Sequence, residues 1–181
     1  MDGLLSQSRI LNSSIFGGGG IAIKSVQHIS YVWNDTTTTK DISITSVDND
    51  KSLIFLNFSE SVNATIGAIA VAFINATTIR LYRNTGSALT QPVKIQVVEF
   101  NGVKSKQTGA NAQSGTSRYS VTVTKINIEK SILVAYCTNP TADTSMIRFV
   151  VEHSILDSET IQLKTNAATD ATTYWQLLEF K

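Results

Sequence analysis

The feature of this sequence that most constrains its fold is an internal repeat with an offset of about 80 residues. Five short blocks of the first half recur in the same order in the second half. The paired blocks are 23–27 and 103–107, 42–45 and 121–124, 51–55 and 130–134, 78–81 and 160–163, and 96–100 and 176–180. This pattern predicts two copies of one structural unit, with constant strands and loops of varying length. The copies span residues 23–100 and 103–180, and because only Asn101 and Gly102 separate them, we expect the copies to touch.

Inside each copy, apolar residues alternate with polar ones, which is the period of a β-strand and not of a helix. The alternation is clearest at 42–47, 79–81, 121–124 and 161–163. Turn-forming residues separate these runs, so we expect about six strands in each copy. The predicted fold class is therefore all-β, with two tandem small antiparallel β-sandwich repeats. Residues 108–116 are small and polar, and we expect a loop there in place of a strand.

Each copy is small for an independent domain. A unit of about 78 residues is near the lower limit for a self-sufficient hydrophobic core. The chain is 42% hydrophobic and only 16% charged, so it has enough apolar residues for a core and little charge to keep chains apart. We therefore expect the two units to pack together and the chain to form a homo-oligomer.

An N-terminal arm, residues 1–22, precedes the first copy. It contains four consecutive glycines, Gly17, Gly18, Gly19 and Gly20, which no packed element favours. The arm also carries the apolar residues Leu4, Leu5, Ile10, Leu11, Ile15 and Phe16. Two interpretations stay open. The arm is either a disordered leader or an extended or partly helical tether, whose apolar residues dock on a partner while the glycines act as a hinge.

Charge and hydropathy argue against nucleic acid and membrane as partners. The net charge is +1, and the basic residues are scattered except for Lys104 and Lys106, which we expect in a solvated polar loop. The longest apolar run, residues 66–74, is too short to span a bilayer. The sequence opens without the pattern of a secretory signal, so we expect synthesis in a cytoplasm.

The polar residues show no pattern of an active site or metal centre. His28 and His153 occupy non-equivalent places in the two copies and lack the spacing of zinc ligands. The acidic run 48–50 is replaced by residues 127–129 in the second copy, one of which is isoleucine, and this favours a hairpin turn over a calcium loop. The single cysteine, Cys137, is expected at a strand end as a buried thiol. We therefore predict no enzyme activity, no cofactor and no metal.

Glu99 and Glu179 close the two copies in identical settings. Paired carboxylates can hydrolyse glycosides, but each of these lies in a terminal strand beside a phenylalanine. Their repetition favours a role in the fold, such as a charge at a sheet edge.

The ends of the copies resemble a known class of protein. The segment Ile23-Lys24-Ser25-Val26-Gln27, alternating strands and a closing Val97-Val98-Glu99-Phe100 are similar to the small β-sandwich proteins of tailed bacteriophages. Those proteins commonly open with an IKSVQ-type motif and close with a W-x-V-V-E-F/Y-type motif. Here Trp175 supplies the closing aromatic in the second copy, whereas Ile95 takes its place in the first, and His28 stands where Arg is more usual.

This resemblance implies a structural accessory protein of a bacteriophage virion, either a head decoration (cement) protein or a tail-surface component. Its partners would be other virion proteins, and it would reach the virion after synthesis in the host bacterial cytoplasm. The alternative is a phage fibre or receptor-binding module whose loops at 34–39 and 108–116 contact a glycan or protein of the host surface. Neither role involves catalysis.

Overall fold

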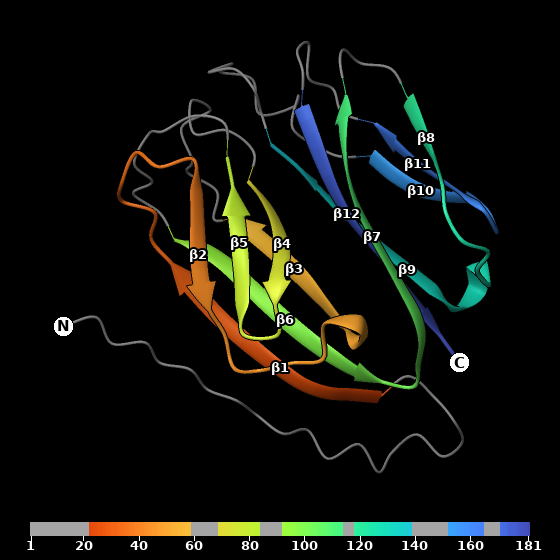
Figure 1. Cartoon of the computed structure of the whole chain (residues 1–181), viewed down its shortest axis with the longest axis horizontal. Coiled ribbons are helices and arrows are strands. Elements are labelled where there is room, and N and C mark those ends of the chain that lie inside the picture. Colours follow the sequence, from red (N-terminus) through yellow and green to blue (C-terminus); the bar gives the residue numbers. More distant parts are fainter. Residues whose placement is uncertain (1–21, 59–68, 84–91, 114–117, 139–151, 165–170) are drawn as a thin grey trace.

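The computed structural model describes residues 22–58, 69–83, 92–113, 118–138, 152–164 and 171–181. This part of the chain is all-β, apart from two short 3-10 turns (Figure 1). In the first half the strands are β1 (Ala22–Tyr31), β2 (Thr39–Ser43), β3 (Ser52–Phe58), β4 (Ala70–Asn75), β5 (Thr78–Tyr82) and β6 (Val93–Asn101). In the second half they are β7 (Val103–Gln113), β8 (Arg118–Thr122), β9 (Ser131–Cys137), β10 (Glu152–Asp157), β11 (Thr160–Lys164) and β12 (Ala171–Phe180).

The two halves share one strand order. The first half forms the three-stranded sheets β1-β6-β3 and β2-β5-β4, and the second half forms the equivalent sheets β7-β12-β9 and β8-β11-β10. Every strand pairing in these sheets is antiparallel. Two three-stranded sheets around an apolar core make each half a small β-sandwich, so the predicted fold class is confirmed.

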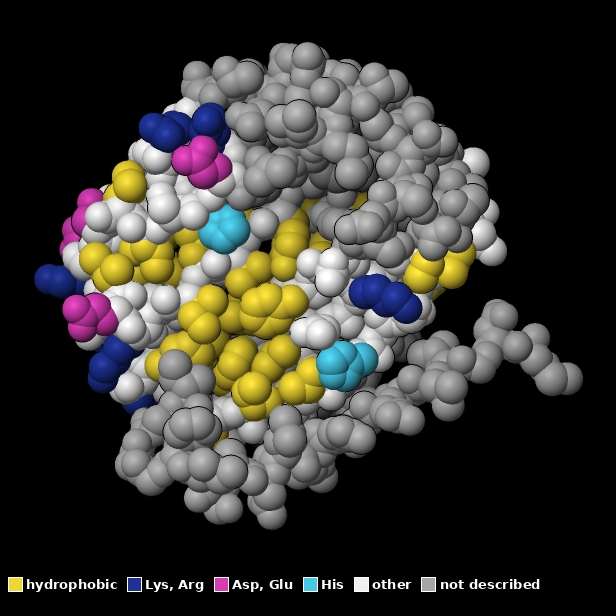
Figure 2. All heavy atoms as spheres, turned by 180° about the vertical axis from the view of Figure 1, so that it is seen from behind, with side chains coloured by type: hydrophobic (Ala, Val, Ile, Leu, Met, Phe, Trp, Pro, Cys, Tyr) yellow, Lys and Arg dark blue, Asp and Glu magenta, His cyan; other side chains and the backbone are white. Residues whose placement is uncertain are grey.

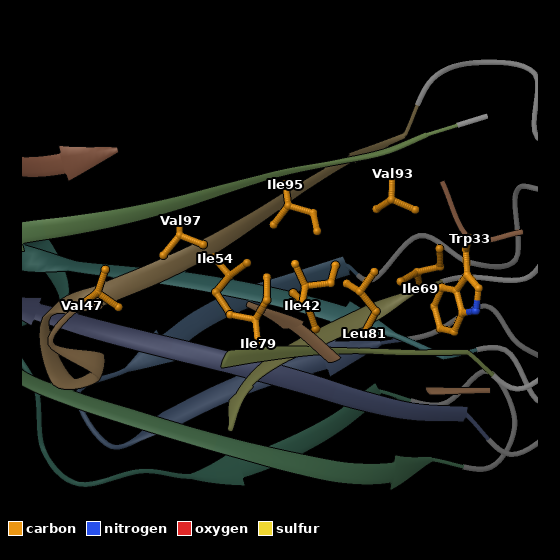
Figure 3. Close-up of a cluster of buried hydrophobic side chains, with 11 residues drawn as sticks. Trp33, Ile42, Val47, Ile54, Ile69, Ile79, Leu81, Val93, Ile95 and Val97 are labelled. Atoms are coloured by element: carbon orange, nitrogen blue, oxygen red, sulfur yellow. The ribbon is translucent and has the colours of Figure 1, made fainter. Parts of the chain in front are cut away.

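The central strand β6 shows how the alternating sequence builds this architecture. Ile95 and Val97 point inward, opposite Ile79 of β5, into the apolar core of the first half (Figure 3). Val98 and Phe100 belong instead to a second apolar cluster, on the outer face of the same sheet. The strand is therefore buried on both faces over its last residues, which explains why its sequence becomes nearly continuous in apolar residues.

The second apolar cluster joins the two halves. Its buried members come from both halves and are Leu53, Val98, Phe100, Val103, Val134, Leu178 and Phe180. The equivalent residues Phe100 and Phe180 meet edge to face, with ring centroids 5.4 Å apart. The chain turns between β6 and β7 at Gly102, whose φ of 74° is a conformation that glycine adopts without strain. The two halves are in contact, as their short connection predicts.

The second half does not replace its first strand with a loop. The prediction for residues 108–116 is wrong over 108–113, because these residues continue β7 and pair with β12. The small residues have a packing reason here: a Cβ atom at Gly109 would lie 2.6 Å from ring atoms of Trp175. Residues 114–117 lie outside the described part of the chain.

The acidic run 48–50 is not a hairpin turn. Residues Asn49–Lys51 form a 3-10 turn, η1, between β2 and β3, which lie in different sheets. The side chain of Asp48 caps this turn by accepting a backbone N–H from inside it. In the second half, Asn127 caps the equivalent turn Ile128–Lys130, η3, in the same way. The position therefore needs a capping oxygen, which either side chain supplies.

A buried glutamate fastens the strands of the second half. Glu179 of β12 is 2% exposed and accepts hydrogen bonds from Lys104 Nζ (2.9 Å), Ser105 Oγ (3.1 Å) and the backbone N–H of Asn127 (2.9 Å). Burial raises the pKa of Glu179, but these hydrogen bonds outweigh burial and hold the pKa below its usual value. The carboxylate thus connects β12 to β7 and to the residue that begins η3.

The first half repeats this arrangement at Glu99. Its carboxylate accepts hydrogen bonds from Lys24 Nζ (2.8 Å), Ser25 Oγ (3.3 Å) and the backbone N–H of Asp48 (3.2 Å). Both glutamates therefore have a role in the fold, but the suggested sheet-edge position is wrong. β6 and β12 are the central strands of their sheets, and the carboxylates are buried.

Candidate functional site

The outer face of the β7-β12-β9 sheet lies against a strand edge of the first half. Among the described strands, β3 pairs only with β6, so its other edge presents unpaired backbone groups. Gln176 accepts a hydrogen bond from the N–H of Ile54 (3.3 Å), and its amide nitrogen lies 3.5 Å from the carbonyl oxygen of the same residue. The hydroxyl of Tyr136 accepts the N–H of Leu56 at 2.8 Å. Side chains of the second half thereby cover an edge strand of the first.

Ring stacking extends this contact. Tyr174 stacks on Tyr82, with ring centroids 4.5 Å apart and an angle of 18° between the rings. Tyr174, Gln176 and Leu178 therefore share the face of β12 that meets the first half, whereas Leu177 points the other way into the core of its own half. We call this surface, the outer face of the β7-β12-β9 sheet, the docking face.

Lys106 of β7 adds a charged contact on the docking face. Its Nζ lies 2.7 Å from the carbonyl oxygens of both Asn49 and Ser52, and 4.4 Å from the centroid of the Phe73 ring. Burial lowers the pKa of Lys106 to about 8. The predicted loop is therefore wrong, and so is the predicted solvation of Lys106, whereas Lys104 is exposed as predicted. Both lysines lie on β7, where Lys104 binds a buried carboxylate and Lys106 joins the halves.

A groove of about 410 Å³ runs between the halves, and Lys106 is part of its lining. A lysine with a lowered pKa in a groove has the properties of a nucleophile. Here, however, the Nζ atom donates to two carbonyl oxygens and faces an aromatic ring. These contacts give Lys106 a structural role at the contact.

Apart from Phe100 and Phe180, which meet as equivalent residues, the contact between the halves is not reciprocal. In a two-fold arrangement, the first-half residues equivalent to Gln176 and Tyr136 would bind β9 in the same way. Those residues are Gln96 and Asn57, and both are exposed. Within the described part of the chain, neither forms a hydrogen bond with β9. The two halves are therefore related head to tail.

The first half carries a face equivalent to the docking face, and we call it the open face. It is the part of the outer face of the β1-β6-β3 sheet that lies beyond Leu53, Val98 and Phe100, which the cluster between the halves buries. His28, Ser30, Phe55, Asn57, Lys94 and Gln96 line a hollow of about 680 Å³ there. In Figure 1 the β2-β5-β4 sheet lies in front of this sheet, so the open face belongs to the side seen from behind. Figure 2 shows that side, with apolar side chains gathered across its middle and charged groups mostly around them.

The side chains of Trp33 and Arg83 hold the polar loop at residues 34–39 in place. The guanidinium of Arg83 lies 4.0 Å from the centroid of the buried Trp33 ring, and it donates to the carbonyl oxygens of Asp35 (2.6 Å) and Thr37 (2.9 Å). Trp33 Nε1 donates to the Asp35 carboxylate at 3.0 Å. A hydrogen bond from Lys40 is the main cause that holds the pKa of Asp35 well below its usual value. The loop is thus an ordered, exposed polar segment.

The predicted docking arm is not tested by the structure. Its apolar residues from Leu4 to Phe16 and its glycines Gly17–Gly20 all lie in residues 1–21, outside the described part of the chain. The arm therefore stays a prediction.

The residues considered for catalysis or metal binding are dispersed. His28 and His153 are both exposed, on β1 and β10. The carboxylate of Glu152, next to His153 in the sequence, binds Lys164 (3.2 Å) and Arg118 (3.3 Å). In residues 22–181, outside the undescribed segments, no group of three or more His, Cys, Asp or Glu side chains is placed to hold a metal ion.

Cys137 lies at the end of β9 and is 2% exposed, which confirms a buried thiol at a strand end. Burial raises the pKa of this thiol to about 12. Its sulfur is therefore neutral at physiological pH and behaves as a small core side chain.

In the part of the chain that the structure describes, no helix is long and apolar enough to cross a membrane. Comparison of the chain with protein-family models, curated proteins and solved structures finds no match to any of them.

Proposed function

We propose that this chain is a structural accessory protein of a bacteriophage virion, a decoration (cement) protein of the head or a component of the tail surface. In this role it binds neighbouring protein subunits through the open face. Its mechanism is geometric, because burial of apolar surface and hydrogen bonds to strand edges supply the binding energy. The resemblance of its opening and closing motifs to phage β-sandwich proteins supports the virion setting.

The observation that carries the proposal is the different use of one sheet face in the two halves. In the second half, this face binds the β3 edge through Gln176. In the first half, Gln96 occupies the equivalent position and is exposed beside the half-buried Phe55. A surface with the plan of an existing protein contact and a partly apolar composition is suited to bind protein.

The motifs behind the resemblance lie side by side in the fold. The opening motif belongs to β1 and the closing motif to β6, where Val26 pairs with Val98. Lys24 of the opening motif donates to Glu99 of the closing motif. The resemblance therefore concerns the residues around the buried glutamate, which connect β1 to β6. The open face lies on the same two strands.

The test is the presence of the protein in purified particles. Tagged protein should co-purify with virions, and electron microscopy should place it at fixed positions on the head or tail. Gln96→Glu should lower its occupancy, because it puts a charge on the open face. Gln162→Glu, the same change on the β8-β11-β10 sheet, should leave occupancy unchanged. Absence of the protein from purified particles would overturn the proposal.

The loop at residues 34–39 supports a second candidate function, a receptor-binding module of a phage fibre. The support from Trp33 and Arg83 gives this loop a fixed shape, so a host glycan or protein would meet a preorganised polar surface. The other loop considered for this role is mostly strand β7. Within the described part of the chain, the receptor hypothesis thus depends on residues 34–39.

A binding assay separates the two candidates. A receptor-binding module should bind host cells as purified protein and compete with phage adsorption, and Thr36→Arg in the exposed loop should abolish both effects. A virion accessory protein should show neither effect, and its loss should lower the stability of particles instead.

A further inference from the structure

A head-to-tail contact leaves two surfaces without partners. Within the chain, the docking face of the second half meets the β3 edge of the first half, and β4 also lies against β9 and β12. In the described part of the chain, the corresponding surfaces that remain are the open face of the first half and the β9–β10 edge of the second. Every copy of the chain presents both.

We infer that copies of this chain associate head to tail, with the open face of one copy bound to the β9 edge of the next. The contact inside the chain is the template for the contact between chains. The inference rests on the proposed function and names the partner of the open face, which is a second copy.

The backbone of β9 offers the groups that the template requires. Val97 pairs with Ile54 in the first half, and Leu177 pairs with Leu133 in the second, so the two edges have the same register. Leu133 therefore presents an N–H and a carbonyl oxygen as Ile54 does. No side chain in the described residues hydrogen-bonds to Leu133. Gln96, the same residue type as Gln176, is the group on the open face that would bind it.

Differences in exposure between equivalent residues show where a partner is missing. Leu53 of β3 is 0% exposed because the contact between the halves buries it, whereas its equivalent Ile132 of β9 is 36% exposed. Ile128 of η3 is 44% exposed, and the first-half residue that would meet it is Val26, which is half-buried and packs at the border of the cluster between the halves. In the contact between copies, Ile128 and Val26 would take the positions that Asn49 and Lys106 occupy in the contact within the chain. A second copy on the β9 edge would cover both isoleucines.

One pair of positions weakens the contact between copies. Tyr174 and Tyr82 stack inside the chain, but their equivalents are Lys94 and Lys164. Two lysines placed as these tyrosines are would repel each other, and Glu152, bound to Lys164, offsets only part of that repulsion. We therefore expect the contact between copies to be weaker than the contact within a chain, and reversible.

The geometry also limits the form of the assembly. A head-to-tail contact repeated by one rotation gives a closed ring when the rotation closes and an open filament when it does not. Phe100 and Phe180 are equivalent residues in mutual contact, so the axis that relates the halves passes near them. Sedimentation distinguishes a ring, which has a limiting size, from a filament, which grows with concentration.

The experiment is sedimentation velocity on the purified full-length chain over the micromolar range. The unmodified chain should associate with rising concentration. Gln96→Glu places a charge on the open face, and Ile132→Glu places a charge at the β9 edge. Each variant should raise the dissociation constant of self-association about tenfold or more. Gln162→Glu should sediment as the unmodified chain. Circular dichroism and thermal melts confirm that each variant is folded.

Mixing the two variants tests the head-to-tail geometry. The Ile132→Glu chain keeps an intact open face, and the Gln96→Glu chain keeps an intact edge. At concentrations where each variant alone is monomeric, an equimolar mixture should therefore form one-to-one complexes and nothing larger. The double variant Lys94→Tyr with Lys164→Tyr restores the stacked pair and should associate more tightly than the unmodified chain.

Three results would overturn the inference: a monomer at every concentration, association that Gln96→Glu leaves unchanged, or a mixture of the variants that stays monomeric. These results are distinct from failure of the proposed function. A monomer that enters virions through Gln96 would contradict only the self-association. A chain that self-associates as described but is absent from virions would contradict only the virion role.

Discussion

The side-chain amide of Gln176 lies against both backbone groups of Ile54, its oxygen 3.3 Å from the N–H nitrogen and its nitrogen 3.5 Å from the carbonyl oxygen. One glutamine thus does what a neighbouring strand would do at this point of the β3 edge. Exposed strand edges promote unwanted pairing, and natural β-proteins cover or interrupt them. In this chain the second half covers the edge of the first with side chains.

Replacing Gln176 with alanine should destabilise the fold. The change leaves the N–H and carbonyl oxygen of Ile54 buried without a partner, which costs about 1–3 kcal/mol. Urea denaturation of the dilute chain measures this loss as a lower midpoint. Gln96→Ala is the matched control, because the equivalent residue is exposed, and its effect should stay within about 0.5 kcal/mol. Equal effects of the two changes would contradict the role of Gln176.

The buried amino group of Lys106 should make the stability of the protein depend on pH. Its pKa falls from an ordinary value of 10.5 in the unfolded chain to about 8 in the folded chain, because the charged form is buried. Between these values the unfolded chain binds more protons, so the contribution of Lys106 to stability should rise with pH from about 8 to 10.5.

The measurement is the free energy of unfolding of the unmodified chain minus that of Lys106→Met, over this pH range. Methionine keeps most of the apolar stem and removes the titrating group. The difference should grow by an amount on the order of 1 to 3 kcal/mol. A difference that stays constant or falls with rising pH would contradict burial of a charged Lys106.

Glu179→Gln should lower stability by about 1–2 kcal/mol at neutral pH, because the amide loses the charge-assisted hydrogen bonds from Lys104 and the Asn127 N–H. The pKa of Glu179 is depressed in the fold, so its stabilisation is present above the unfolded pKa and disappears as pH falls through the folded pKa. The deficit of the variant should therefore shrink in acid. Glu129→Gln, at an exposed position, should have little effect at neutral pH. If Glu129→Gln lowered stability as much as Glu179→Gln does, this would argue against a special role of the buried Glu179 carboxylate.

The thiol of Cys137 should react with a disulfide reagent at pH 8 only when the protein opens. Its 2% exposure blocks access, and its raised pKa of about 12 keeps it protonated. Labelling of the native chain should be far slower than labelling in concentrated urea, and destabilising variants such as Gln176→Ala should accelerate it. Rapid labelling of the native chain would show that the end of β9 is open.

The sequence predicts the strands of this protein well and their contacts poorly. Alternation at 42–47 and its repeat at 121–124 reveals strands, because side-chain period is a local property. The extent of β7 escapes the same reasoning, because Gly109 is small to accommodate Trp175, a partner far along the chain. Strand order depends on such distant pairings and leaves no local signal.

The contact between the halves left a signal that is visible once the repeats are aligned. Gln96 and Gln176 are identical, which marks a shared position, but nothing local says that one is buried and the other exposed. Lys106 replaces Val26 between otherwise similar neighbours, and this change marks a position whose surroundings differ. The contact of Lys106 with Asn49 is seen only in the folded structure.

The most direct test of head-to-tail assembly is a disulfide between chains at the positions equivalent to the stacked tyrosines. Chains with Lys94→Cys and chains with Lys164→Cys are mixed under mild oxidation, while the buried Cys137 stays inert. Head-to-tail assembly should give efficient cross-linking of residue 94 to residue 164 in the mixture, and little cross-linking in either chain alone. Efficient 94-to-94 or 164-to-164 cross-links, or no cross-link in the mixture, would contradict it.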